Sequence, residues 1–426
     1  MRPRLLTSAP NPTWILAGFV ATACAPHKST STGQATTVDS GQPSGTDTAS
    51  DHTTAAAGAY VTADRLTFPE ASGPCMDAEL ADLDGDGDLD VVLAMEFADN
   101  IILDNDGSAR FSVTVLDGPA PVAGAAGADS EDVVVLDVDG DGRLDLLFAS
   151  EDGGGAEELW RNTGSGWALS SDRLPTSRAT NGAALGDLDG DGVPEVVLAN
   201  AGDEMVWTLD GAGGMVDVSS TYFAEPTGTV SQDPELADLD GDGDLDLVVA
   251  NENGDTALFF NEGGQFVPGP FPTDPGEESR EVDAGDLDGD GDLDLVVANV
   301  GWGRGPSQDR WFENDGTGDF TPRNLPVDSY ETLDVDLIDL DHDGDLDILR
   351  ANVDVVSGRL VAAPFDAFLN DGTGTFRPAP ESLLPWIDGE GLDVEAGDLN
   401  GDGWPDLYLC ASSSRDAVLL YVPGSE

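Results

Sequence analysis

Seven stretches of the chain place oxygen-bearing side chains at positions 1, 3, 5 and 9 of a nine-residue loop that carries glycine at position 6. The most regular copy spans residues 238–246, with Gly243 at position 6. Glycine lets the backbone turn through positive φ at no steric cost, so the curled loop can aim four side chains and one backbone carbonyl at a common point. The loops begin at Asp82, Asp137, Asp187, Asp238, Asp286, Asp339 and Asp398.

The chemistry of these loops is that of a hard divalent cation. A cluster of carboxylates is unfavourable alone and becomes favourable around an ion that takes six to eight oxygen ligands, which describes Ca²⁺ better than Mg²⁺. We therefore expect up to seven Ca²⁺ ions, held by the side chains at positions 1, 3, 5 and 9 and the backbone carbonyl at position 7. The predicted ligands are Asp82, Asp84, Asp86, Asp88 and Asp90; Asp137, Asp139, Asp141, Arg143 and Asp145; Asp187, Asp189, Asp191, Val193 and Glu195; Asp238, Asp240, Asp242, Asp244 and Asp246; Asp286, Asp288, Asp290, Asp292 and Asp294; Asp339, Asp341, Asp343, Asp345 and Asp347; and Asp398, Asn400, Asp402, Trp404 and Asp406.

The residues that flank each loop distinguish it from an EF-hand. An EF-hand has a helix on each side and a bidentate Glu at position 12, whereas position 12 here is aliphatic or aromatic in six copies and Arg350 in the remaining one. A run of aliphatic residues follows each loop, as at residues 247–250, so each loop joins two strands. A solvated acidic turn, the alternative, needs neither the glycine nor this repeated ligand spacing.

The loops recur at intervals of 48 to 59 residues, a period typical of solenoids, propellers and arrays. Each repeat divides into four predicted strands, which in the fourth repeat lie at about 233–238, 245–250 and 256–260 and from Phe266 onward. Seven four-stranded units predict an all-β fold, a seven-bladed β-propeller, which leaves only short sheet edges exposed.

Together with a second motif, these loops resemble a known repeat family. D-x-D-G-D-G-x-x-D is followed by a strand and then by N-D-G-x-G-x-F, at residues 314–320 and 370–376, with weaker versions at 105–111 and 261–266. This pattern, over about residues 58–426, is similar to the FG-GAP or VCBS repeat. The resemblance implies a β-propeller like the integrin α-chain headpiece, with calcium loops inside its blades and a role in adhesion or ligand binding.

Three substitutions depart from the loop motif. Position 9 is Glu195 in the third loop, position 3 is Asn400 in the seventh, and position 4 is His342 in the sixth. The first two keep an oxygen ligand, and position 4 is not expected to bind metal. Because the third and seventh loops carry less charge, we expect their sites to be weaker.

The 426 residues include 84 acidic and 17 basic side chains, a formal charge of −67. This charge repels nucleic acid and anionic membranes, so neither is an expected partner. The 39% of hydrophobic residues lie in strand-like runs and indicate a globular core rather than a disordered acidic chain. We expect a monomer.

The first 57 residues are expected to precede the folded domain. Residues 1–23 are typical of a secretion signal, with Arg2 and Arg4 before an apolar stretch. Residues 21–24 are similar to a bacterial lipobox, which would make Cys24 the lipidated first residue of the mature chain; cleavage without lipid is the alternative. Residues 24–57 are a disordered Ser/Thr/Gly-rich tether. Residues 58–426 would form the propeller of a secreted, outer-membrane or cell-surface lipoprotein that touches the membrane only through its anchor.

The last repeat lacks a fourth strand, and a spare strand is present at residues 60–66. We expect this N-terminal strand to complete the last blade and lock the ring. Cys75 and Cys410 fall at the same end of the first and last repeats, so a disulfide between them is one expectation in an oxidising compartment. The alternative is that Cys410 is simply a small buried residue.

Acidic residues also recur five and three positions before the loops, as at Asp77 and Glu79. Period-two alternation puts them on one side of the innermost strand. We expect that side to face a hydrated central channel, because water stabilises carboxylates that lack partners. Cation or sugar binding in the channel is the alternative.

Arginine is scarce, and its placing suggests a ligand surface at the end opposite the loops. The candidate residues are Trp302, Arg304, Arg310 and Arg350, which would suit a carbohydrate or an acidic protein. Structural salt bridges to the many acids are the alternative. The three histidines, His27, His52 and His342, leave no Ser-His-Asp or Cys-His arrangement.

Three functions remain open from the sequence. The first is a calcium-binding adhesion or ligand-binding module for a protein or carbohydrate. The second is an extracellular lyase or hydrolase that acts on polysaccharide through paired carboxylates. The third is a scaffold with no ligand of its own.

Overall fold

The computed structural model describes residues 58–63, 73–118, 129–151, 157–252, 256–272, 278–302, 308–326, 330–356, 359–412 and 416–424. This part of the chain is all-β, as predicted, with two single-turn helical segments, η1 (Ser171–Arg173) and α1 (Ser219–Tyr222). Within it, no helix has the length and apolarity needed to cross a membrane. The predicted signal, Cys24 and the tether lie outside the described residues.

All described strand pairs are antiparallel, and most of them join strands that follow one another in the chain. One sheet comprises β2 (Cys75–Ala81), β3 (Asp90–Met95), β4 (Ile101–Asn105) and β5 (Phe111–Val115). The next comprises β6 (Ser130–Leu136), β7 (Asp145–Ser150), β8 (Glu158–Asn162) and β9 (Trp167–Leu169). An eight-stranded sheet follows, with β10 (Thr180–Gly186), β11 (Glu195–Gly202), β12 (Met205–Leu209), β13 (Met215–Asp217), β14 (Thr229–Ala237), β15 (Asp246–Asn251), β16 (Ala257–Asn261) and β17 (Phe266–Pro268).

Three further sheets complete the fold. The first comprises β18 (Glu278–Gly285), β19 (Asp294–Val300), β20 (Arg310–Asn314) and β21 (Phe320–Asn324). A five-stranded sheet comprises β22 (Glu331–Ile338), β23 (Asp347–Val355), β24 (Leu360–Leu369), β25 (Arg377–Pro378) and β26 (Ile387–Gly389). The last comprises β27 (Gly391–Gly397), β28 (Asp406–Ala411), β29 (Ala417–Val422) and β1 (Ala59–Thr62).

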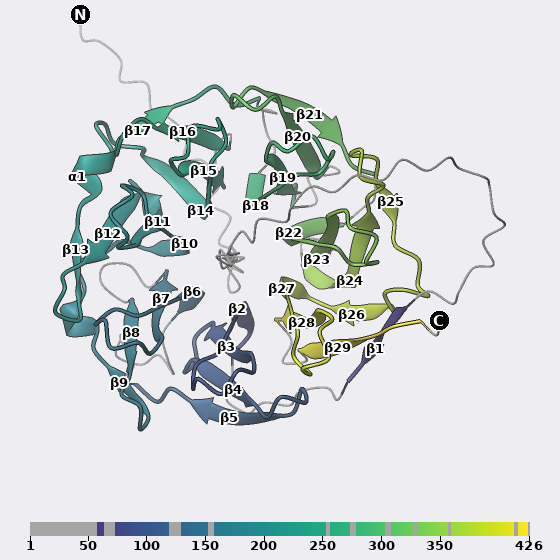
Figure 1. Cartoon of the computed structure of the whole chain (residues 1–426), viewed down its shortest axis with the longest axis horizontal. Helices are drawn as coiled ribbons and strands as arrows, with labels where there is room; N and C mark the ends of the chain where they lie inside the picture. The colour runs from purple at the N-terminus through teal and green to yellow at the C-terminus, as the bar shows by residue number, and fades with distance from the viewer. Residues whose placement is uncertain are drawn as a thin grey trace, which may run out of the picture.

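The sheets surround a central axis, and the innermost strands are β2, β6, β10, β14, β18, β22 and β27 (Figure 1). The inner strands contact one another around the ring, so that β2 packs against both β6 and β27. The eight-stranded sheet consists of two four-stranded units, joined where Ala201 and Gly202 of β11 pair with Val230 and Thr229 of β14. The result is a closed, propeller-like ring.

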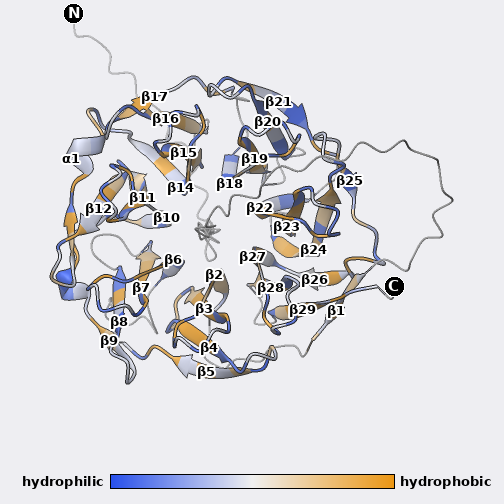
Figure 2. Ribbon diagram, in the orientation of Figure 1, coloured by the Kyte–Doolittle hydropathy of each residue, from blue (hydrophilic) through white to orange (hydrophobic). Residues whose placement is uncertain are grey.

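The hydrophobic core lies between neighbouring sheets. Second strands such as β3 are buried along their whole length because both faces are covered, which explains their unbroken aliphatic runs. Between the first two sheets, Val92 and Ala94 pack with Leu146, Phe148 and Trp160. Hydrophobic residues recur along the strands of each sheet (Figure 2), whereas β5 at the rim is largely exposed.

The ring closes between the two ends of the described chain. β1 pairs antiparallel with β29, with Tyr60 opposite Tyr421, and completes the sheet that contains β27. The centroids of the two tyrosine rings lie 5.2 Å apart. Part of the strand expected at residues 60–66 lies outside the described residues, and β1 ends at Thr62. A disulfide joins Cys75 of β2 to Cys410 of β28, with 5.6 Å between their Cα atoms.

Buried aspartates of the inner strands connect neighbouring sheets. Asp77 Oδ2 accepts a hydrogen bond from the Val133 N–H at 2.9 Å, and Asp393 Oδ2 accepts one from the Ala78 N–H at 3.0 Å. The second of these bonds crosses the boundary where the ring closes. Equivalent bonds are made by Asp132, Asp233 and Asp334.

These five aspartates, which stand five positions before their loops, are each at most 3% exposed. A cavity of about 630 Å³ among the inner strands is lined by four acids that stand three positions before their loops, Glu235, Asp283, Asp336 and Glu395. For the five aspartates, the expectation that they face a hydrated channel is wrong. Each carboxylate lies in the interface between two sheets, where a main-chain amide of the next inner strand takes the place of water.

Candidate metal loops

Each acidic loop connects an innermost strand to the second strand of the same unit, and its position-1 carboxylate organises the turn. In the first loop, Asp82 accepts hydrogen bonds from the N–H groups of Gly85 at 2.8 Å and Gly87 at 3.1 Å. The position-6 glycines of all seven loops have φ between +84° and +100°. Residues with a Cβ are strained in this region, which explains why position 6 is always glycine.

The position-9 carboxylate is held by two main-chain amides. Asp90 Oδ2 accepts a hydrogen bond from the Leu83 N–H at 3.1 Å, and its Oδ1 accepts one from the Asn105 N–H at 2.8 Å. Both bonds orient the side chain within its loop and tie the loop to the end of β4. The same pair of bonds holds Asp145, Asp246, Asp294, Asp347 and Asp406.

Oxygen atoms of the predicted ligands converge in these loops. One carboxylate oxygen from each of Asp82, Asp84 and Asp86 lies within 4.8 Å of the other two. The same holds for Asp187, Asp189 and Glu195, and for Asp238, Asp240 and Asp246. Calcium–oxygen bonds of about 2.3–2.6 Å place ligands on opposite sides of the ion about 5 Å apart, so these oxygen-only clusters fit Ca²⁺.

The electrostatics of the loops favour a bound cation. Burial raises the pKa of the position-9 carboxyl groups, to about 6 for Asp90 and Asp246 and about 7 for Asp294 and Asp347. The charges of the other loop carboxylates raise these pKa values further, while the main-chain hydrogen bonds lower them. Keeping the loops ionised therefore costs free energy that a divalent ion would offset.

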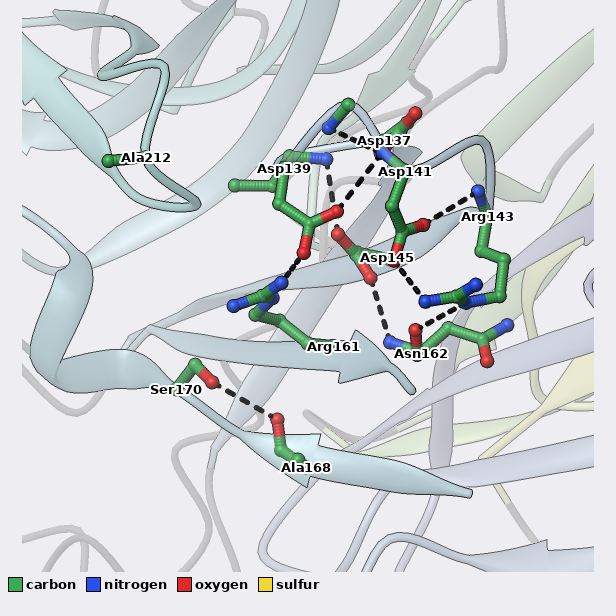
Figure 3. Close-up of polar contacts among 12 residues, drawn as sticks. Asp137, Asp139, Asp141, Arg143, Asp145, Arg161, Asn162, Ala168, Ser170 and Ala212 are labelled. Atoms are coloured by element: carbon green, nitrogen blue, oxygen red, sulfur yellow. Dashed lines mark hydrogen bonds and ion pairs between the residues drawn. The ribbon is translucent and has the colours of Figure 1, made fainter. Parts of the chain in front are cut away.

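The second loop differs from the others because two guanidinium groups contact its carboxylates (Figure 3). Arg143, at position 7, turns back toward the carboxylate of Asp141. Arg161 of β8 forms an ion pair with Asp139. In this loop, the three carboxylates whose oxygen atoms lie close together belong to Asp137, Asp139 and Asp145, so one member of the cluster is also the partner of Arg161.

The sixth and seventh loops meet through aromatic side chains. His342, at position 4 of the sixth loop, has φ of +61°, and its ring centroid lies 4.5 Å from that of Trp404 and 4.2 Å from that of Tyr421. Burial lowers the pKa of His342, so its imidazole packs as a neutral ring. In the seventh loop, Asn400 Nδ2 donates a hydrogen bond to Asp406 Oδ2 at 2.8 Å, which engages one oxygen of a predicted ligand.

The asparagine of the N-D-G motif, or its equivalent, fixes five of the seven loops against the next unit. Asn314 Nδ2 donates hydrogen bonds to the Leu239 carbonyl, 75 residues earlier, at 2.8 Å and to the Leu293 carbonyl at 2.9 Å. The motif was visible in the sequence as a family feature, but its partner in the preceding repeat was not. Equivalent bonds to a preceding loop are made by Asn105, Asn162, Asn261 and Asn370.

The residues expected to form a ligand surface are held by neighbouring side chains. Trp302 donates a hydrogen bond from Nε1 to Glu278 Oε1 at 2.6 Å, and the guanidinium carbon of Arg280 lies 4.8 Å from the centre of its ring. Arg310 lies on β20 and is partly buried. Arg304 lies outside the described residues.

Arg350 is 1% exposed, so its assignment to a ligand surface is wrong. Its guanidinium forms ion pairs of 2.8 Å with Asp309 and with Asp366 and lies 4.1 Å from the centre of the Phe368 ring. The second strand of each sheet is covered on both faces, so a charged residue there is buried and needs partners within the fold.

Comparison with protein families gives matches that follow the loops. A profile described as the FG-GAP-like repeat matches residues 82–148, 137–198, 187–249, 238–297 and 352–409. The first four matches each begin at the first aspartate of a loop and run through the next loop. A search of curated proteins found no match.

Two solved structures with TM-scores above 0.5 share the ring-like fold. BBS1N in complex with ARL6DN covers 86% of this chain and 98% of its own, with 10% identity and a TM-score of 0.54. The extracellular domain of the hybrid two-component system BT4673 from B. thetaiotaomicron covers 85% of this chain and 39% of its own, with 10% identity and a TM-score of 0.52. An Agrocybe aegerita lectin specific for non-reducing terminal N-acetylglucosamine covers 80% and 86%, with 18% identity and a TM-score of 0.49.

The family matches form two continuous stretches, 82–297 and 352–409, which together make up more than half of the 426 residues. They contain six of the seven acidic loops. The chain therefore belongs to the FG-GAP-like repeat family.

Proposed function

We propose that this protein is a calcium-stabilised, seven-bladed β-propeller that acts outside the cell as a binding module for a protein or carbohydrate ligand. Seven loops, each between the first and second strands of its own unit, support the count of seven blades. The observation that carries the proposal is the recurrence of an oxygen-only carboxylate cluster, already oriented by main-chain amides, in one unit after another.

Calcium has a structural role in this proposal. In the first loop, the ion would be held by Asp82, Asp84, Asp86 and Asp90 with the backbone carbonyl of Asp88. It would then join the turn to the strands on either side. Because the N-D-G asparagines bond to carbonyls of the loops, a loop that an ion orders would also stiffen the interface with the next unit.

The binding role is supported by the family and by the fold. FG-GAP repeats resemble the integrin α-chain headpiece, which recognises ligands. BBS1N, which has a similar fold, was solved in complex with a protein, ARL6DN. A ring whose interfaces are held by buried hydrogen bonds is a rigid platform, and rigid platforms bind with little loss of conformational entropy.

The proposed location follows from the N-terminal residues. Residues 1–23 would direct export, Cys24 would carry the lipid, and residues 24–57 would hold the propeller away from the membrane. Calcium concentrations outside cells suit sites of modest affinity. Mass measurement of the mature chain from its host would identify the first residue and any attached lipid; a chain that still begins at Met1 would rule out this location.

The calcium proposal is tested by chelation and titration. The full chain, stripped with EDTA and dialysed, should take up several equivalents of Ca²⁺, and its melting temperature should rise with calcium far more than with the same concentration of Mg²⁺. A stripped chain that binds no calcium and melts unchanged would refute the proposal. Glycan arrays and pull-downs from surface extracts, run with and without calcium, would then separate carbohydrate from protein ligands.

A further inference from the structure

The second loop carries its own counter-charges. It contains four carboxylates, Asp137, Asp139, Asp141 and Asp145, and two of them contact guanidinium groups within the fold (Figure 3). Arg143 contacts Asp141 and Arg161 contacts Asp139. The four negative charges are therefore offset by two positive charges, which leaves a formal charge of −2 in this loop.

The other loops lack this compensation in the described part of the chain. In the sixth loop, Arg377 approaches Asp341 only to 3.6 Å, and its side chain is 59% exposed. The remaining five loops form no ion pair with Lys or Arg among the described residues. The fourth loop keeps five uncompensated carboxylates, at Asp238, Asp240, Asp242, Asp244 and Asp246.

The two arginines are partly exposed, and contacts within the fold anchor both of them. Arg143 Nε donates a hydrogen bond to the Asn162 carbonyl at 2.9 Å. The side chain of Arg161 is 33% exposed, that of Asp139 only 15%, and the turn at Gly213 of the next unit lies over them. A Cβ added to Gly213 would lie 3.1 Å from Arg161 Nη1 and 3.2 Å from Asp139 Cβ. An ion that displaced Arg161 from Asp139 would also disturb this covering turn.

We infer that the second loop is neutralised by Arg143 and Arg161 and stays free of Ca²⁺ at concentrations that fill the uncompensated loops. This inference rests on the proposed calcium function. Calcium affinity follows the negative charge of the ligand set, and here a divalent ion must compete with two cations that already hold Asp139 and Asp141. We expect its affinity for this loop to be at least about tenfold weaker than for the fourth loop.

The experiment removes the same two carboxylates from two loops of the full chain. Bound calcium is counted by native mass spectrometry, and affinities are measured by isothermal titration. The variant Asp240→Asn/Asp242→Asn, in the fourth loop, should bind one equivalent fewer than the wild type. The matched variant Asp139→Asn/Asp141→Asn, in the second loop, should bind the wild-type number. Loss of one equivalent from both variants would overturn the inference.

A converse variant keeps the test decisive if the asparagine variants fold poorly. Arg143→Gln/Arg161→Gln should gain one equivalent of calcium, or bind its weakest ion at least about tenfold more tightly. The control is Arg178→Gln, which removes an exposed ion pair with Asp203 away from the acidic loops. If the wild type binds calcium and the double variant binds the same number of ions with the same affinities, the inference is overturned and the calcium proposal still stands. No calcium uptake by any chain would refute the calcium proposal together with it.

Discussion

The disulfide between Cys75 and Cys410 should be a major source of the stability of this ring. It links β2, near the start of the folded chain, to β28, near its end. Breaking it removes no hydrophobic contact, because both sulfur atoms stay buried among the same neighbours. Reduction acts mainly on the unfolded chain, whose conformational entropy increases when the cross-link is removed.

The size of this effect follows from the length of chain that the bond encloses. For the 335-residue separation of Cys75 and Cys410, the chain-entropy relation gives about 6 kcal/mol at 25 °C. Residual structure in the unfolded chain lowers this value, and native disulfides typically contribute about 2 to 5 kcal/mol. We therefore expect reduction to lower the free energy of unfolding by roughly 3 to 6 kcal/mol.

The assay compares oxidised and reduced wild-type chain in guanidinium chloride at one fixed, saturating calcium concentration. Reduced wild type is a better comparison than a cysteine variant, since no atom is deleted and no cavity forms. In the full chain produced without lipid attachment, alkylation of the denatured, unreduced protein should modify one of its three cysteines, Cys24. Modification of all three cysteines would refute the reasoning. So would free energies of unfolding that differ by less than about 1 kcal/mol between the oxidised and the reduced chain.

Three further predictions concern other parts of the fold. Gly243→Ala should lower the free energy of unfolding by roughly 1 to 2 kcal/mol, because φ is +97° and no other atom lies within 4 Å of the added Cβ, so only backbone strain acts; unchanged denaturant midpoints would contradict this. Arg350→Met should lower it by roughly 3 to 5 kcal/mol, because Asp309 and Asp366 lose the charge that pairs with them; Arg350→Lys should recover part of the loss. Burial raises the pKa of Glu204 from its ordinary 4.5 to about 7, which favours the neutral carboxyl group in the folded protein. The stability that this preference contributes is complete below pH 4.5 and is lost as the pH rises through 7. Glu204→Gln should therefore match the wild type near pH 4 and gain on it by up to roughly 3 kcal/mol by pH 8; an advantage independent of pH would count against this.

The sequence was most informative where chemistry and local geometry coincide. The turn at residues 238–246 can be predicted from its own sequence, because the aspartate spacing and Gly243 lie within nine residues. The aliphatic run at 247–250 predicted the buried second strand for the same reason. The all-β fold and the family followed from the repetition of these local signals.

Contacts between repeats could not be predicted in this way, because their two partners lie far apart in the sequence. Asp77 was recognised as part of an acidic series, but its partner is the amide of Val133, 56 residues later in the chain, so its burial was missed. The ion pair of Asp139 with Arg161 joins a loop to a strand that lies beyond β7. The scarcity of arginine suggested an exposed role for Arg350, whereas the strand that carries it is covered on both faces.

The pairing of β1 with β29 has a consequence for how the chain is made. Among the described strands, β1 is synthesised first and its partner β29 is synthesised last. At roughly 5–20 residues per second, synthesis of β29 follows that of β1 by roughly 20 to 70 s, during which β1 lacks its partner. The ring therefore cannot close before β29 has been synthesised, and a product that ends before β29 would keep an unpaired edge and be prone to self-association.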